Sequence, residues 1–338
     1  MKVGMIGRAG SGRSTLFDAV TGLTGAARQP GRMRLGLARV RDPRVDALSE
    51  ICRPRRTIYA ELTLALPPGA LDVASLHEMR DLRALAHVVD AFSGASLQQA
   101  VAAQLAQLQT EMLLADMERV ENRLVRMRKG GHARPGERET VEAAARLLEG
   151  ERVLRLHPWD ERAAGLLGEL GLVSQRPLLT VVNIAEDRLG QPLPAGVVRD
   201  AAAVGSELLA LSAELEREIV QLESAAQAEF LRAYGLAEPL SQRFARACLS
   251  LLDQICFFTI GPDEVRAWPV ERDIRAQRAA RAIHTDLEKG FIRAEVITFA
   301  DFIAHRSEAA CRAAGRQRIE GKDYVVKDGD IITVRFNV

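Results

Sequence analysis

Short apolar runs separated by helical segments mark the first part of the chain and residues 173–222 as an α/β domain. The helix expected over Ser14–Thr21 ends at Gly22, and Asp42-Pro43 begins a short helix with the aspartate as N-cap. The strands are expected in the apolar run that starts at Val3 and at Leu35–Val40, Tyr59–Leu66, Ala84–Val89 and Leu178–Val182.

Residues 97–172 show a different pattern, in which apolar residues recur every three or four positions. Gly130-Gly131 and Pro135-Gly136 interrupt the pattern, and a second helical stretch follows. We expect an inserted antiparallel helical hairpin, a short coiled coil. The recurring apolar residues of its first helix are Leu105, Leu108, Met112, Met117, Val120, Leu124 and Met127, and Val141, Ala145 and Leu148 of its second helix face inward.

The last third of the chain changes from helix to strand. Residues 221–254 are amphipathic, and strands are expected at Cys256–Ile260, Phe291–Phe299 and in the alternating segment that ends the chain. The predicted domains are therefore residues 1–96 with 173–222, the hairpin at 97–172, connecting helices at 223–254, and a small α+β domain at 255–338.

Composition narrows the function classes. The 338 residues carry a formal net charge of +1, which excludes a bulk electrostatic attraction to nucleic acid. The four cysteines form no C-x-x-C pair, which indicates reduced structural residues. Met1 leads directly into the first expected strand and no run of 18 apolar residues occurs, so we expect a cytoplasmic protein.

The first fifteen residues indicate the class of ligand that the protein binds. Gly7, four further residues, Gly12, Arg13 and Ser14 reproduce the phosphate-binding G-x-x-x-x-G-K-[ST] loop, with arginine where lysine is expected. Such a loop surrounds phosphate oxygens with backbone N–H groups and offers the positive end of the next helix. The predicted phosphate-binding residues are Gly7, Gly10, Ser11, Gly12, Arg13, Ser14 and Thr15, with Ser14 as the one Mg²⁺ ligand.

Two later loops are candidates for holding the base. Asn183 and Glu186 follow the strand at Leu178–Val182, and the amide of an asparagine offers a donor and an acceptor to a purine edge. Ser212 and Ala213 follow another apolar stretch and would close over the base. The cofactor expected is therefore ATP or GTP.

Several segments together resemble the Obg-like ATPase (YchF) family of P-loop translation-factor GTPases. The similar segments include Asn183-Ile-Ala-Glu186, Phe257 to Trp268, Ile283 to Val296, and Glu320 to the end of the chain. The resemblance implies a Ras-like nucleotide domain, an inserted helical hairpin and a C-terminal β-grasp domain of the TGS type. It also implies ATP favoured over GTP, and association with ribosomes.

Three departures from the family concern one function. Arg13 replaces the lysine, Pro30 stands where the first switch threonine is expected, and Leu66 replaces the aspartate of the second switch. All three positions would hold Mg²⁺ or the charge of the γ-phosphate, so we expect weak Mg²⁺ binding and weak or no hydrolysis. No catalytic residue is assigned.

The remaining candidates have two interpretations each. His87 in an apolar strand fits a core residue better than a ligand, and His284-Thr285-Asp286 fits a helix cap better than a proton relay. The basic hairpin tip is either an exposed charged surface or a contact to ribosomal RNA phosphates. Its basic residues are Arg123, Arg126, Arg128, Lys129, His132 and Arg134.

The sequence thus favours a purine-nucleotide-binding regulator of translation with little turnover. Two alternatives stay open, a slow but active ATPase or GTPase and a structural module that has lost nucleotide. Retained nucleotide binding is favoured over the structural module by the intact Gly7, Gly12 and Ser14, together with Asn183 and Glu186.

Overall fold

The protein is described here by a computed structural model, which covers residues 2–23, 31–94 and 96–337. Contacts divide the chain into two compact units. Unit 1 contains Met1–Ala38 and Thr63–Cys248, and unit 2 contains Arg39–Leu62 and Leu249–Val338. Pro30, which the sequence placed in the first switch, lies outside the described residues.

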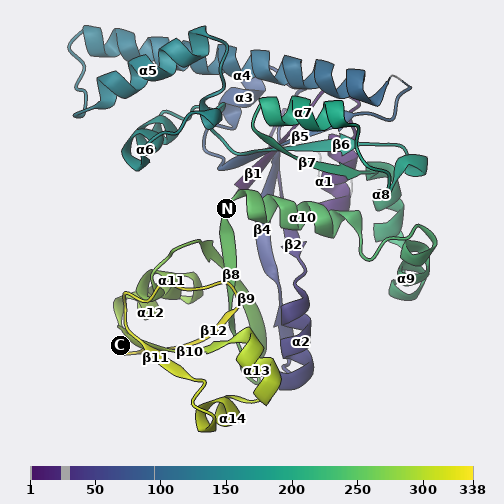
Figure 1. The fold of residues 1–338 in the computed structure, drawn as a ribbon, viewed down its shortest axis with the longest axis vertical. Helices are drawn as coiled ribbons and strands as arrows, with labels where there is room; N and C mark the ends of the chain where they lie inside the picture. Colours follow the sequence, from purple (N-terminus) through teal and green to yellow (C-terminus); the bar gives the residue numbers. More distant parts are fainter. Residues whose placement is uncertain (1, 24–30, 95, 338) are drawn as a thin grey trace. The chain divides into compact units, whose positions relative to one another are not determined.

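Unit 1 is built on a six-stranded sheet of order β2-β4-β1-β5-β6-β7 (Figure 1). β4, β1, β5, β6 and β7 pair in parallel, so their carboxyl ends share one edge of the sheet. The strands are β1 (Lys2–Ile6), β2 (Arg34–Val40), β4 (Ala60–Leu66), β5 (Ala84–Asp90), β6 (Leu178–Asn183) and β7 (Ser206–Leu211).

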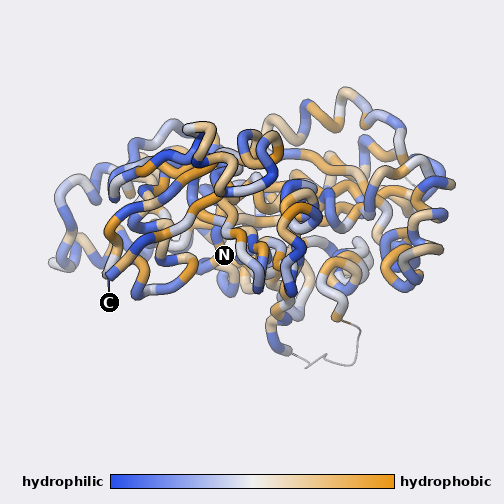
Figure 2. The backbone as a smooth tube through the Cα atoms, turned by 90° about the horizontal axis from the view of Figure 1, so that it is seen from below, coloured by the Kyte–Doolittle hydropathy of each residue, from blue (hydrophilic) through white to orange (hydrophobic). Residues whose placement is uncertain are grey.

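Helices cover both faces of this sheet. One buried cluster joins β5 and β6 to residues of α3 (Val73–Glu78), α4 (Leu97–Arg128) and α7 (Ala195–Ala203). Successive strand side chains point to opposite faces, so buried Val3, Met5 and Val88 face the other side, where α1 (Arg13–Thr21) and α8 (Ala213–Gln221) pack on each other. Figure 2, which colours the backbone by hydropathy, shows mostly hydrophobic residues along the interior strands and a mixture of hydrophobic and hydrophilic residues along the outer helices.

The 32-residue α4 serves two cores. Leu105, Leu108 and Met112, which the sequence placed in the hairpin segment, belong to the cluster on the sheet. Val120 and Met127 pack with α5 (Glu137–Glu149), η2 (Leu154–Leu156) and α6 (Glu161–Glu169) in a separate cluster. The expected hairpin is therefore present, and only the second half of α4 forms it (Figure 1).

A buried carboxylate fixes the root of the hairpin. Asp116 of α4 is fully buried and accepts hydrogen bonds from the backbone N–H groups of Val173 (2.7 Å) and Ser174 (2.8 Å), where the chain returns to the sheet. Arg155 donates to the carbonyl oxygens of Arg176 and Val204, both at 2.8 Å. Burial raises the pKa of Asp116, and the two N–H donors offset that cost.

Unit 2 contains a second sheet of order β11-β10-β12-β8-β9-β3. Its strands are β3 (Arg56–Ile58), β8 (Gln254–Thr259), β9 (Glu264–Glu271), β10 (Phe291–Thr298), β11 (Arg318–Glu320) and β12 (Asp330–Phe336). The helices that begin after residue 249 are α11 (Ala276–Ile283), α12 (Thr285–Lys289), α13 (Phe299–His305) and α14 (Glu308–Ala313). His284 accepts a hydrogen bond from Asp286 N–H at the start of α12, which confirms the capping interpretation.

The segment between the two expected switches belongs to unit 2, whereas the sequence had placed it in the nucleotide domain. β3 pairs in parallel with β9, and α2 (Pro43–Cys52) packs on β9 and α13. Arg44 of α2 donates to Asp328 (2.7 and 3.2 Å) and lies over the ring of Phe258. Backbone pairing and this ion pair are long-range contacts that local patterns do not reveal.

The remaining helices are α9 (Ser224–Ala233), which belongs to unit 1, and α10 (Leu240–Leu251), which belongs to unit 1 up to Cys248. All four cysteines are free thiols. No helix in the described part of the chain has both the length and the apolarity needed to cross a membrane.

His87 is a core residue, as the sequence favoured, and it is fully buried in β5. Neither of its ring nitrogens has a hydrogen-bond partner among the described residues. Burial disfavours the imidazolium and lowers the pKa of His87 to about 3. The folded protein therefore keeps His87 neutral at pH values where the unfolded chain binds a proton.

This difference predicts acid sensitivity. Because the pKa of His87 is lower in the folded state, stability falls as pH drops from about 6.5 toward 3, and the loss reaches about 2 kcal/mol at pH 5. We expect His87→Leu to abolish that part of the loss, as measured by urea unfolding of both proteins at pH 7 and pH 5. His132→Leu, at an exposed position, is the control. Equal acid sensitivity of wild type and His87→Leu would contradict the prediction.

Candidate functional site

The glycine loop lies at the carboxyl end of β1 and turns directly into α1. Gly7 is required by space, because a Cβ there would lie 2.4 Å from the carbonyl oxygen of Val88. Gly12 is the N-cap of α1 at φ 88°, and no side chain caps the helix. The first N–H groups of α1 are therefore available to an anion, as the motif predicts.

Asn183 ties this loop to the opposite end of the site. It is 4% exposed at the end of β6, its Nδ2 donates to the carbonyl oxygen of Ser11 (3.0 Å), and its Oδ1 accepts from Ala213 N–H (2.9 Å). Both amide atoms therefore already hold protein groups, whereas the sequence assigned them to the purine edge. Asn183 positions the two loops, and its role toward a base stays a prediction, as does that of its neighbours.

Those neighbours form an acidic end. Glu186 begins the short helix η3 (Glu186–Arg188), and its carboxylate accepts from the hydroxyl of Tyr234 at 3.3 Å. Ser212 caps α8 by accepting from Leu215 N–H, so its hydroxyl is already engaged.

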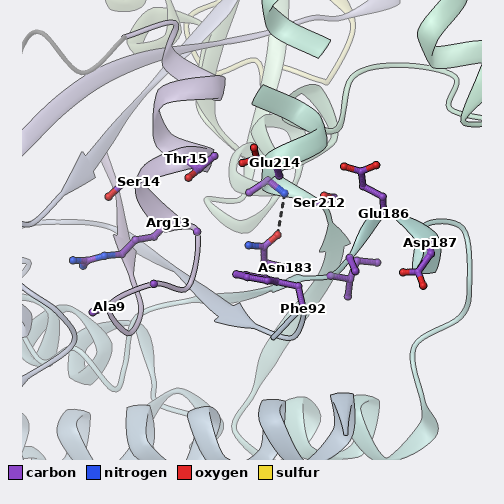
Figure 3. A pocket seen from close by; sticks show the side chains of 15 residues that line it. Ala9, Arg13, Ser14, Thr15, Phe92, Asn183, Glu186, Asp187, Ser212 and Glu214 are labelled. Atoms are coloured by element: carbon purple, nitrogen blue, oxygen red, sulfur yellow. Dashed lines mark hydrogen bonds between the residues drawn. The ribbon is translucent and has the colours of Figure 1, made fainter. Parts of the chain in front are cut away.

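One pocket of about 960 Å³ joins the two ends (Figure 3). Arg13 and the start of α1 lie at one side, and Glu186, Asp187 and Glu214 lie at the other. Its size suits a small ligand such as a nucleotide. The polarity suits a molecule with phosphates at one end and N–H groups at the other.

Arg13 does not point toward the base end. In Figure 3 its side chain extends away from Asn183 and Glu186. Its Nη2 donates to the carbonyl oxygen of Gly69, in the loop that follows β4. Burial lowers the pKa of Arg13, but the guanidinium remains charged.

Comparison with known proteins assigns the chain to a family. A family model named YchF-GTPase_C and described as "Protein of unknown function (DUF933)" matches residues 254–337. Proteins called "Ribosome-binding ATPase YchF" match the whole chain, at 34% identity in Haemophilus influenzae (99% of that protein) and 32% in Bacillus subtilis (100% of that protein). The chain belongs to the YchF family. A solved structure, titled as the Schizosaccharomyces pombe YchF GTPase, superimposes with a TM-score of 0.86 at 26% identity over 99% of this chain and 97% of that one.

The YchF fold brings most of the predicted site residues together. Gly7 and Ser11 are buried beneath the pocket. The others line it, and they are Gly10, Gly12, Arg13, Ser14, Thr15, Asn183, Glu186, Ser212 and Ala213. Their role in binding stays a prediction.

Sequence reasoning missed Phe92, which is 45% exposed and lines the pocket. Asp90 accepts hydrogen bonds from the backbone N–H groups of Phe92 and Ser93, both at 3.2 Å, and so shapes the turn. The signal was available, since Phe92 follows a buried strand whose carboxyl end lies at the site. Asp187 of η3 and Glu214 in the first turn of α8 were missed for a different reason, because single charged residues have no distinctive pattern.

The residues present do not fit a strongly held Mg²⁺. Among the described residues, no group of three His, Cys, Asp or Glu side chains could hold a metal ion. Leu66, at the expected aspartate position, is apolar and 3% exposed. Of the protein ligands expected in such a site, only the hydroxyl of Ser14 remains.

Two glycines of the loop provide a matched test. Gly10 (φ 79°) and Gly12 (φ 88°) share the same backbone strain when replaced by alanine, about 1–2 kcal/mol. A Cβ at Gly10 meets no atom within 4 Å, whereas at Gly12 it lies 2.2 Å from Nδ2 of Asn183. We expect Gly12→Ala to cost about 2 kcal/mol more than Gly10→Ala in urea unfolding, because Asn183 loses its two hydrogen bonds. Equal costs for the two variants would contradict this account of Asn183.

Proposed function

We propose that this protein binds a purine nucleotide, ATP or GTP, and acts as a ribosome-associated regulator with weak or no hydrolysis. The pocket carries the proposal, because it joins an uncapped helix N-terminus and a glycine loop to an acidic end. Its relatives' names, ribosome-binding ATPase, support both the nucleotide and the ribosome.

Weak hydrolysis follows from the charges around the γ-phosphate position. Phosphoryl transfer depends on a positioned metal ion and on positive charge at the transferred group. Leu66 offers no carboxylate, Arg13 is held by Gly69, and Mg²⁺ retains only Ser14. A slow ATPase or GTPase remains the second candidate, and the relatives' names favour it.

ATP is proposed over GTP. A carboxylate can accept from the N1–H and N2–H₂ groups of guanine, and many GTPases place an aspartate there for that purpose. The longer side chain of Glu186 is expected to disturb that fit. The difference is about 1–2 kcal/mol, comparable to one hydrogen bond to a charged group. The family resemblance points the same way.

We expect calorimetry to show binding of ATP and GTP at micromolar dissociation constants, about −5 to −8 kcal/mol, with ATP tighter. Single-turnover assays should show hydrolysis near the uncatalysed rate. No heat at millimolar nucleotide would favour the structural module, and rapid hydrolysis would favour the active enzyme.

Restoring hydrolysis should need more than the lysine. Arg13→Lys alone leaves Leu66 and Pro30 in place, so we expect no turnover from it. The combination Arg13→Lys, Pro30→Thr and Leu66→Asp is the smallest set expected to show measurable hydrolysis. Turnover by the single variant would show that the two other positions are not limiting.

The hairpin tip and the C-terminal domain are the proposed contacts to ribosomal RNA and protein. Arg123 donates to Glu137 (2.7 Å), and Arg134 pairs with Glu169, so these two residues stabilise the tip itself. The exposed basic residues with no hydrogen-bond or ion-pair partner among the described residues include Arg126, Arg128 and Lys129. The proposal therefore narrows from the six basic residues predicted at the tip to these three.

Replacing Arg126, Arg128 and Lys129 together by alanine should weaken co-sedimentation with ribosomes and reduce its salt dependence. The expected change in the slope of log affinity against log salt is about 2–3, since each lost phosphate contact contributes just under one unit. The control removes the same charge at exposed Arg152, Arg199 and Arg243. Equal losses in both triple variants would locate the contact elsewhere.

A further inference from the structure

The loop after β4 is attached to the glycine loop at two points. Nη2 of Arg13 donates to the carbonyl oxygen of Gly69, and the backbone N–H of Leu71 donates to the carbonyl oxygen of Gly7 at 3.2 Å. In the family pattern this loop is the second switch. Here the carbonyl oxygen of Gly69 in this loop accepts from the guanidinium of Arg13 in the glycine loop.

The other end of the same guanidinium is unused. Nη1 of Arg13 is buried and has no hydrogen-bond partner among the described residues. A buried donor without an acceptor is destabilising, and a ligand oxygen would relieve that cost. Arg13 also lines the pocket, at the side where the glycine loop would hold phosphates.

The planar guanidinium lets arginine bind two oxygen atoms here in a geometry that lysine cannot provide. Its two terminal nitrogens are held apart in a rigid fork and can bind two oxygens in fixed directions, whereas an ammonium group acts as a single point charge. The charge is also independent of a metal ion, and the described residues offer no carboxylate set to hold one.

We propose that Arg13 takes over the linking role of Mg²⁺, with Nη1 binding a phosphate oxygen of the nucleotide while Nη2 keeps the carbonyl of Gly69. The ligand class is a metal-free nucleoside di- or triphosphate. The bound phosphate thereby fixes the loop Pro67–Leu71 through one side chain. This inference rests on the proposed nucleotide binding and adds its metal independence and its means of sensing phosphate.

Calorimetry with ATP and ADP, in Mg²⁺ and in EDTA, tests the first part. The wild-type dissociation constants should change by less than about threefold on removing Mg²⁺. Arg13→Lys should bind about tenfold more weakly in EDTA, the loss of one charge-assisted hydrogen bond. Arg199→Lys, the same substitution on the exposed face of α7, should behave as wild type.

Hydrogen exchange at the amide of Leu71 tests the second part. Nucleotide should slow its exchange in the wild-type protein, equally with and without Mg²⁺. In Arg13→Lys, nucleotide at saturating concentration should leave its exchange rate unchanged. The wild-type comparison of Mg²⁺ with EDTA needs no variant and remains decisive if Arg13→Lys folds poorly.

The outcomes separate this inference from the proposed function. No nucleotide binding by the wild-type protein in either condition would overturn both. Wild-type binding that falls a hundredfold in EDTA would overturn the inference and leave nucleotide binding intact. The same holds if nucleotide protects Leu71 equally in Arg13→Lys and in wild type.

Discussion

The site depends on one buried side chain. Asn183 has one donor and one acceptor committed to Ser11 and Ala213, so three loops from different strands are held at fixed distances. Asn183 is buried, so losing either hydrogen bond would leave an unpaired polar group away from water, which is costly. Gly12 is constrained by the same contact, since any Cβ there would displace the amide. The position of the phosphate end relative to the acidic end therefore follows from Asn183.

The departures at Arg13 and Leu66 have a common electrostatic logic. Leu66 is buried, and a carboxylate in that position would have to be desolvated, at considerable cost unless a cation accompanied it. In the proposed nucleotide site, this position would then offer no carboxylate to hold a cation beside the phosphates. Arg13 supplies a permanent positive charge at the glycine loop, and its fork allows that charge to hold the neighbouring loop at Gly69. The two substitutions are thus better understood together than separately.

The sequence predicted the fold class, the hairpin and most pocket residues, because glycine loops, helical periodicity and buried strands are local patterns. It did not predict that Leu105, Leu108 and Met112 pack on the sheet, because the same spacing of apolar residues suits either partner. It predicted a role for Asn183 in base binding but not its hydrogen bonds to Ser11 and Ala213, since residue type shows what a side chain can bind and not which groups lie within its reach. Phe92 was missed although its place just after a buried strand, at the carboxyl edge of the sheet, was a usable signal.

The segment Arg39–Leu62 has a consequence for any signal that the site produces. β4 contributes Ala60–Leu62 to unit 2 and Thr63–Leu66 to unit 1, and the loop held by Arg13 begins at the next residue. The strand is continuous backbone, and in unit 1 its residues pair in register with β1. Within unit 2 the same segment is anchored by β3 pairing with β9 and by Arg44 with Asp328. β4 follows β3 directly along the chain, and β3 pairs with β9 in the second sheet, so the loop at Gly69 has a covalent connection to unit 2.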